Sequence, residues 1–368
     1  MIPLVDLKTQ YNNLKKDLEK AINKVLSKTE FILGEEVDLF EEEFARYCSS
    51  SNCISVASGT DALYLSLRAL NIGEGDEVIT VANTFVATVL AITYTQAKIV
   101  LVDINPDTYN IDVDKIQKEI TPNTKAILPV HLYGRPVEMD KIISIAKKYD
   151  LYVIEDACQA HGASFKGKRV GSFGDMGCFS FYPGKNLGAY GDGGAIVTSN
   201  KNIADYLKLI RNYGSPKKYY HSIIGYNSRL DTLQAAILRV KLIHLEEWNK
   251  KRLNNAKLYN LKLKGVGDLI LPNIDNDFKH VFHLYVIRTK NRGRLLEYLK
   301  NNDIYCGIHY PVPIYSLEAF RYLGYKSKDF PVTEKYSKEI LSLPMYPELN
   351  EKQIDLITEK IKDFFKNV

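Results

Sequence analysis

Short apolar runs alternate with amphipathic stretches through the first two thirds of the chain. The apolar runs have the length and composition of buried strands, and most of the stretches between them show the helical period. The predicted strands are 53–57, 77–81, 98–103, 125–130, 151–156, 178–182 and 195–199, and the helices between them include 61–70, 84–96, 138–149 and 202–212. Strands alternating with helices predict an α/β fold with a mostly parallel seven-stranded sheet.

The two ends of the chain do not follow this alternation of strands and helices. Two amphipathic helices precede the alternation, one from Tyr11 to Leu26 and one after Gly34. Beyond Leu230 the pattern predicts a long helix, then strand, helix, strand and helix, at 231–263, 281–288, 292–302, 304–309 and 352–366. We therefore expect a large α/β domain over residues 1–245 and a smaller α+β domain over residues 246–368.

Composition narrows the class of protein. The chain has 368 residues, 45% of them hydrophobic, and a net charge of +5. No stretch approaches the ~20 apolar residues of a spanning helix, and the N-terminus lacks the apolar core of a signal peptide. The basic runs are short, and the five cysteines include no CxxC pair. We expect a cytoplasmic protein that binds neither membrane nor nucleic acid and holds no metal.

A glycine turn follows the first predicted strand and opens a helix at Ser58-Gly59-Thr60-Asp61. Free backbone N–H groups and the positive end of the helix dipole at such a turn suit a phosphate group. A simple helix cap by Thr60 or Asp61 explains the same residues. The turn alone therefore does not decide between the two interpretations.

Asp156 ends a run that is apolar enough to be a buried strand, so its carboxylate needs a partner. The partner could be a structural cation. It could also be a protonated pyridinium nitrogen, because a buried carboxylate favours the protonated ring that acts as an electron sink. Gln159 and His161 follow on the same turn and could reach the edge of such a ring.

Lys185 lies in a turn rich in glycine and proline between two predicted strands, and Ser180, on the strand just before this turn, could donate its hydroxyl to a phosphate. A surface lysine in a loop is the ordinary interpretation. However, the surrounding glycines permit close approach of a ligand, and an amine in a dry pocket has a lowered pKa that lets it condense with an aldehyde. A phosphate cradle, a carboxylate for a ring nitrogen and a lysine for an aldehyde are together what pyridoxal phosphate requires.

The sequence also resembles the DegT/DnrJ/EryC1/StrS family of sugar aminotransferases, enzymes of fold type I, through nearly its whole length. The motifs that carry the resemblance are SGTDAL at 58–63, ANTFVAT at 82–88, EDACQAHGA at 155–163, FSFYPGKNLGAYGDGGAI at 179–196 and GYNSRLDTLQAAIL at 225–238. Some relatives have histidine in place of the lysine and carry out dehydration or deoxygenation. Because this chain keeps Lys185, the resemblance favours transamination.

The resemblance implies a role for each matching residue. Lys185 would form the Schiff base with pyridoxal phosphate, Asp156 would pair with the pyridine nitrogen, and Gln159 would bond the ring hydroxyl. The phosphate would be held by Gly59, Thr60 and Ser180, and Phe85 would stack on the ring, although core packing explains an aromatic there equally well. Asn227 would reach the phosphate from the neighbouring subunit of a homodimer, although a turn and helix cap also explains it.

The substrate follows from the resemblance alone. It implies L-glutamate as amino donor and a dTDP-linked 3-keto-6-deoxyhexose as acceptor, giving a dTDP-3-amino-3,6-dideoxyhexose. His309 and Tyr310, in GIHYPVPIY at 307–315, are candidate sugar or phosphate contacts, although rigid packing would also explain the segment. Tyr182 is a further candidate, and Lys217 could meet the pyrophosphate, although a solvated lysine pair explains Lys217-Lys218 as well.

Three other functions can be compared with the sequence. No residue ties the chemistry to carbon 3, so a 4-keto or a UDP-linked sugar stays open. A cofactor-binding regulator would need a DNA- or partner-binding element, and the sequence contains no recognisable one. A nucleotide-dependent oxidoreductase is disfavoured because no GxGxxG lies between an early strand and helix.

Overall fold

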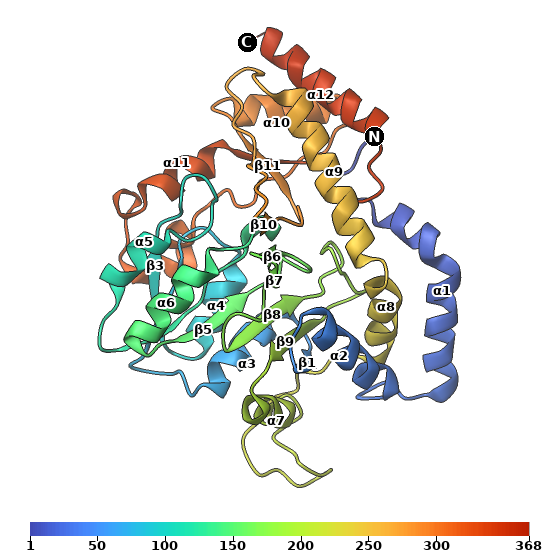
Figure 1. Ribbon diagram of the computed structural model, residues 1–368, viewed down its shortest axis with the longest axis vertical. Coiled ribbons are helices and arrows are strands. Elements are labelled where there is room, and N and C mark those ends of the chain that lie inside the picture. The colour runs from blue at the N-terminus through green and yellow to red at the C-terminus, as the bar shows by residue number, and fades with distance from the viewer. Residues whose placement is uncertain (368) are drawn as a thin grey trace.

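A seven-stranded sheet forms the centre of the computed structural model, which describes residues 1–367 (Figure 1). Its strand order is β1-β9-β8-β5-β4-β2-β3. The strands are β1 (Asn52–Val56), β2 (Glu77–Val81), β3 (Lys98–Val102), β4 (Thr124–Ile127), β5 (Tyr152–Asp156), β8 (Met176–Ser180) and β9 (Gly194–Thr198). Only β9 runs antiparallel to its neighbours, β1 and β8. The predicted mostly parallel seven-stranded sheet is thus confirmed.

Helices cover both faces of this sheet (Figure 1). The helices up to the end of the sheet are α1 (Leu7–Lys28), α2 (Glu35–Tyr47), α3 (Gly59–Ala69), α4 (Val86–Tyr94), α5 (Val113–Ile116), α6 (Met139–Tyr149) and α7 (Lys201–Ile210), with 3-10 turns η1 (Gln117–Glu119) and η2 (Leu132–Gly134). Successive strand residues serve opposite faces: Cys178 belongs to the core under α3, whereas Phe179 belongs to the core under α2. This alternation explains why the strands read as continuous apolar runs.

The C-terminal part places α9, α10 and α12 toward the end of the molecule opposite α7 (Figure 1). Its elements are α8 (Thr232–Leu242), α9 (Leu245–Leu263), β11 (Tyr285–Arg288), α10 (Arg292–Asn301), η3 (Ile314–Ser316), η4 (Glu318–Leu323), η5 (Ser327–Asp329), α11 (Pro331–Glu339), β12 (Ile340–Leu343) and α12 (Glu351–Lys366). A small sheet joins β10 (Phe278–Lys279), β6 (Ser164–Phe165) and β7 (Lys168–Arg169). No helix within residues 1–367 is long and apolar enough to cross a membrane.

Two predicted elements were wrong. The single helix predicted for 231–263 is two helices, because α8 packs in the core beside α2 whereas α9 belongs to the C-terminal core, and the chain changes direction at Ile243 and His244 between them. The segment 304–309 is no strand; it makes isolated bridges, Ile2 with Ile304 and Gly307 with Ser342. The strand that pairs with β11 is β12, which the sequence pattern did not predict.

The boundary predicted at residue 245 stays a prediction. Ile2 and the helices α9, α10 and α12 contribute to one C-terminal core. In contrast, Ile314, Phe320 and Phe330 belong to the core of the large sheet. The segment that carries His309 and Tyr310 therefore joins the two cores, close to the carboxyl ends of the parallel strands.

Candidate functional site

A cavity of ≈ 530 Å³ lies where the parallel strands end. It is lined from four strand ends, by Gly59 after β1, Phe85 after β2, Gln159 after β5 and Ser180 at the end of β8. Ligand sites in open α/β sheets form at this edge. The structure therefore places residues from distant parts of the sequence around one space. Of the predicted site residues, those lining it are Gly59, Thr60, Phe85, Asp156, Gln159, Ser180, Tyr182, Lys185, His309 and Tyr310.

The N-terminus of α3 points its first N–H groups at this region. Ser58 caps the helix by accepting from the N–H of Asp61 at 3.1 Å. That leaves the N–H groups of Gly59 and Thr60, which have no acceptor within their own helix. A Cβ on Gly59 would lie 2.5 Å from the Cβ of Ser180, so only glycine lets the helix approach the end of β8 this closely. The arrangement suits an anion such as phosphate.

Asp156 is 5% exposed at the end of β5. Its carboxylate accepts from the hydroxyl of Thr88 at 2.8 Å and from the N–H of Cys158 at 3.2 Å. Neither donor carries a charge, so these bonds orient the carboxylate without neutralising it. Asp156 can therefore still pair with a cationic group in the cavity.

Gln159 is held by both ends of its amide. Its oxygen accepts from the N–H of Tyr133 at 2.7 Å, and its Nε2 donates to the hydroxyl of Tyr310 at 3.1 Å. The backbone donor fixes which end of the amide is oxygen. The NH₂ group of Gln159 is consequently directed toward Tyr310 and remains available as a donor to a ligand oxygen.

Lys185 lies in a turn between β8 and β9 that is closed by the Lys185 N–H donating to the carbonyl of Tyr182 at 2.9 Å. Burial lowers the pKa of the Lys185 amine, and the nearby Cys158 and Asp156 only partly oppose that effect. A lowered pKa increases the fraction of neutral amine at pH 7, which is the form that attacks a carbonyl carbon.

The far side of the cavity comes from a loop before α11. His309 shares a hydrogen bond between its Nδ1 and the Ser342 hydroxyl at 2.8 Å, and burial lowers the pKa of His309 to about 4. Burial raises the pKa of Tyr310, whose ring centroid lies 5.5 Å from that of Phe85. His309 is thus neutral at pH 7, and Tyr310 carries its proton. Both can form uncharged hydrogen bonds with a polar substrate.

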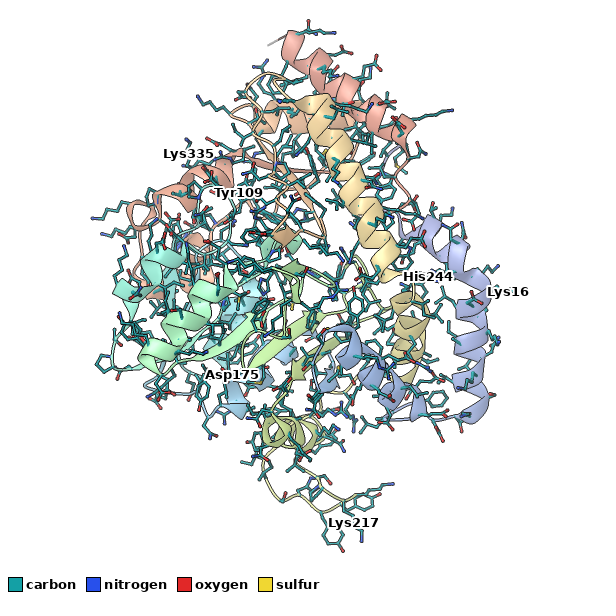
Figure 2. All side chains as sticks on the ribbon, in the orientation of Figure 1. Lys16, Tyr109, Asp175, Lys217, His244 and Lys335 are labelled. Carbon is teal, nitrogen blue, oxygen red and sulfur yellow. The ribbon has the colours of Figure 1, made fainter. Side chains whose placement is uncertain are left out.

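Three residues singled out in the sequence lie elsewhere. Lys217 is on an exposed loop that projects beyond α7 (Figure 2). Asn227 is exposed and follows this loop, where it bridges to Asn212. Neither lines the cavity of its own chain. His161, which by its place in the sequence could reach a ligand, does not line the cavity and is fully buried against Phe179 and Phe181.

Thr88 and His283 are among the residues that line the cavity and that the sequence reasoning missed. Thr88 bonds Asp156, and its position in the ANTFVAT motif was the available signal. His283 lines the cavity from the chain before β11, and its Nδ1 lies 3.3 Å from Oδ1 of Asn186. Nothing in the sequence near His283 distinguishes it from a core histidine.

The residues present fit pyridoxal phosphate. The α3 N-terminus offers N–H groups for the phosphate. Because Gly59 has no side chain, these groups can lie close to Ser180 at the end of β8. Asp156 offers an uncompensated carboxylate for a ring nitrogen, and Gln159 offers a donor for a ring oxygen. Lys185 offers an amine with a lowered pKa for the aldehyde. The cofactor needs each of these groups.

Relatives resemble the chain over almost its whole length. It is 47% identical to dTDP-3-amino-3,6-dideoxy-alpha-D-galactopyranose transaminase of Aneurinibacillus thermoaerophilus, covering 99% of each protein. It is 45% identical to the "Pleiotropic regulatory protein" of Geobacillus stearothermophilus, over 100% of this chain and 99% of that one. It is 44% identical to a UDP-N-acetyl-3-dehydro-alpha-D-glucosamine 3-aminotransferase of Acidithiobacillus ferrooxidans, covering 98% and 97% of the two chains.

A solved structure gives the same result for the fold. The crystal structure of DesV from S. venezuelae, in complex with a ketimine intermediate, superposes with a TM-score of 0.98 at 42% identity, covering 100% of this chain and 99% of that one. The family model of the DegT/DnrJ/EryC1/StrS aminotransferases matches residues 12–362. The chain therefore belongs to the DegT/DnrJ/EryC1/StrS aminotransferase family and is an enzyme of fold type I that depends on pyridoxal phosphate.

Proposed function

We propose that this enzyme transfers the amino group of L-glutamate to a nucleotide-linked keto sugar, preferring a dTDP-linked 3-keto-6-deoxyhexose. The observation that carries the aminotransferase assignment is the meeting of Lys185, Asp156, Gln159 and the α3 N-terminus around one cavity. The names of relatives acting on dTDP-linked and UDP-linked 3-amino sugars support a nucleotide sugar as acceptor. The 47% identity to the dTDP-sugar enzyme favours dTDP.

Each residue has a distinct task in this proposal. When bound, pyridoxal phosphate supplies an aldehyde for amines and an electron-withdrawing ring beside the carbon that loses its proton. Lys185 would hold the cofactor through its amine, and the free amine would carry a proton to and from the substrate carbon. Asp156 would keep the ring nitrogen protonated, and the N–H groups of Gly59 and Thr60 would hold the phosphate with Ser180. Phe85 would pack against the ring.

The sugar is proposed to bind on the side of His309, Tyr310 and Tyr182. Tyr310 donates its hydroxyl proton toward the cavity, because the Tyr310 oxygen already accepts from Gln159. His309 is neutral at pH 7 and is oriented by Ser342. Uncharged donors and acceptors of this kind suit the hydroxyl and keto groups of a hexose.

A panel of nucleotide sugars tests the acceptor. The purified enzyme, loaded with pyridoxal phosphate and L-glutamate, is given a dTDP-linked 3-keto sugar, a dTDP-linked 4-keto sugar and a UDP-linked 3-keto sugar. We expect the highest kcat/KM for the dTDP-linked 3-keto sugar. If kcat/KM is higher with the UDP-linked or the 4-keto sugar, that sugar is the preferred acceptor and the proposed substrate is wrong. If none of the three sugars is turned over, the proposed class of acceptor is refuted.

We propose a homodimer in which Asn227 of the partner subunit completes each site. The loop before Asn227 exposes apolar side chains, with Ile224 90% and Tyr219 81% exposed, as expected of a surface that another subunit covers. Lys217 on the same loop would then approach the partner's nucleotide rather than its own.

Mixing two inactive variants tests the shared site. Lys185→Ala removes the amine of a subunit, and Asn227→Ala removes the residue given to the partner. If the sites are shared, a mixed dimer contains one site with both residues, and activity returns when the variants are exchanged. If mixing restores no activity although sequential purification through a different affinity tag on each variant recovers mixed dimers, Asn227 acts within its own chain.

A further inference from the structure

The turn that carries Lys185 is held by polar side chains of α8 and α9. Asn186 donates to Oδ1 of Asn249 at 2.8 Å. The carbonyl of Gly188 accepts from Nζ of Lys241 at 2.6 Å. The N–H of Tyr190 donates to Oε1 of Gln234 at 2.8 Å. Alternate residues of the turn, Asn186, Gly188 and Tyr190, are thus each bonded to one of these two helices.

Gly188 is the tightest point of this turn. A Cβ at Gly188 would lie 2.2 Å from the carbonyl oxygen of Pro183, so the two sides of the turn touch through their backbones. The N–H of Ala189 also closes the turn by donating to the carbonyl of Phe181 at 2.8 Å. A group that fixes the Gly188 carbonyl therefore fixes the short segment that contains Lys185.

Lys241 is an unusual residue for this task. Its side chain is 0% exposed, and its ammonium lies 4.0 Å from the centre of the Tyr190 ring. Burial alone lowers the pKa of Lys241 to about 7, with no carboxylate within residues 1–367 opposing that effect. Lysine is rarely fully buried without an acidic partner.

Arg239, two residues earlier on α8, differs from Lys241 in having acidic partners. Its guanidinium pairs with Glu36 and, at 2.6 Å, with Glu43 near the protein surface. Arg239 therefore has the counter-ions that Lys241 lacks. A methionine would fill the volume of Lys241 without the cost of desolvating an amine. What the amine adds at this position is the bond to Gly188 and the contact with Tyr190.

We propose that Lys241 is a positioning residue that holds the Lys185 turn through the Gly188 carbonyl and so sets the place of the Lys185 amine relative to Asp156. This inference rests on the proposed role of Lys185. It assigns to Lys241 no contact with the cofactor or with either substrate. The proton transfers attributed to Lys185 depend on alignment, and a displacement of about 1 Å can cost roughly a hundredfold in rate.

The variant Lys241→Met tests this role, with Asn255→Leu as a matched control. Asn255 is also a buried polar residue, on α9, but it bonds the carbonyls of Tyr346 and Leu349, away from Lys185. Apo-protein of each variant is mixed with pyridoxal phosphate, and the rise of absorbance at ~420 nm is followed. The decay of that band is then measured against L-glutamate concentration, and Tm is recorded.

For Lys241→Met we expect the band to form fully but about tenfold more slowly, and to decay roughly 10- to 100-fold more slowly at saturating glutamate. The half-saturating glutamate concentration should change by less than about threefold, because no binding contact is lost. Asn255→Leu should lower Tm without changing either rate. Rates within about twofold of the wild type in Lys241→Met would overturn the proposal.

Tyr190→Leu provides a second test that does not depend on Lys241→Met folding. It removes the ring beside the ammonium from a partly exposed position. Both rates should fall by about threefold, which corresponds to a weak cation–π contact, and unchanged rates would also count against the proposal. Lys185→Ala separates the two hypotheses: if that variant keeps the band, the role of Lys185 itself is wrong, whatever Lys241→Met does.

Discussion

The cavity has two unlike sides. On the cofactor side, Asp156 ends the buried strand β5 and Gln159 lies on the turn after it, and each is oriented by hydrogen bonds from neighbouring elements. On the proposed sugar side, Tyr182 is 61% exposed, and Tyr310 comes from a loop far along the chain. The cofactor side is therefore fixed by the sheet, whereas the sugar side is assembled from segments that the sheet does not position.

This difference matches the chemistry that each side must perform. A cofactor that stays bound through both half-reactions benefits from groups held rigidly in place. Two different substrates must alternate in the other half of the same cavity. Exposed side chains and loop segments can accept both, and they can change between related enzymes without disturbing the fold. We expect substitutions on the cofactor side to lower kcat and those on the sugar side to raise KM.

Lys185→Ala should have the largest effect. Without the amine, the aldehyde has no covalent partner and no group moves the proton, so turnover should fall by about 10³-fold or more and the ~420 nm band should be absent. Absorption spectra and a steady-state assay with glutamate measure both. Lys168→Ala, an exposed lysine on β7, is the control that should retain both properties. A coloured, active Lys185→Ala enzyme would refute the assignment of the cofactor side.

Asp156→Asn should come next. Thr88 and Cys158 donate to different oxygens of Asp156, so asparagine keeps its shape and one of the two bonds but lacks the charge that holds a ring nitrogen protonated. We expect kcat to fall by about 10²-fold while the absorbance band still forms. Asp175→Asn is the control: Asp175 accepts from the N–H of Val153 at 2.8 Å beside the opposite ends of the strands. An unchanged kcat in Asp156→Asn would mean that its carboxylate is structural.

Gly59→Ala should weaken cofactor binding rather than chemistry. The added Cβ would lie 2.5 Å from Ser180 and 3.0 Å from Sγ of Cys158, so α3 must move away from β8. We expect about tenfold weaker binding of pyridoxal phosphate and a loss of about 1–3 kcal/mol of stability. Equilibrium titration and urea unfolding measure these quantities. Gly293→Ala, in the first turn of α10 with nothing within 4 Å, should leave cofactor binding unchanged and should not lower stability.

The two sides also differ in how far the sequence predicted them. Strand-to-turn transitions mark Gly59, Asp156 and Lys185, because a polar group that ends a buried apolar run is costly to bury unless it has a partner. The hydrophobic pattern contains no such signal for His283, which reaches the cavity only through tertiary packing. The break between α8 and α9 was not predicted for the same reason: the sequence there contains neither glycine nor proline, and the two cores impose it.

The motif resemblance supplied what the pattern could not. His309 and Tyr310 follow no predicted strand end, and the expected strand over 304–309 was wrong. Their place in the cavity depends on Ser342 and Gln159, at distances of 33 and 151 residues along the chain. Lys241 illustrates the same limit, since a lysine within an amphipathic helix is ordinarily read as exposed. Contacts of this range are visible only in the folded chain.

Tyr310→Phe should have the smallest effect, and it separates the two sides most directly. The variant keeps the ring beside Phe85 but removes the hydroxyl that accepts from Gln159 and faces the cavity. Loss of one hydrogen bond should raise KM for the nucleotide sugar by about 2- to 10-fold. The rate of the half-reaction with glutamate should stay within about twofold of the wild type. Tyr315→Phe is the control: Tyr315 belongs to the same segment as Tyr310, but its hydroxyl donates to Glu334 on α11, so neither half-reaction should change. If Tyr310→Phe slows the glutamate half-reaction as much as the sugar half-reaction, Tyr310 acts through Gln159 on the cofactor, and the proposed division of the cavity is wrong at this residue.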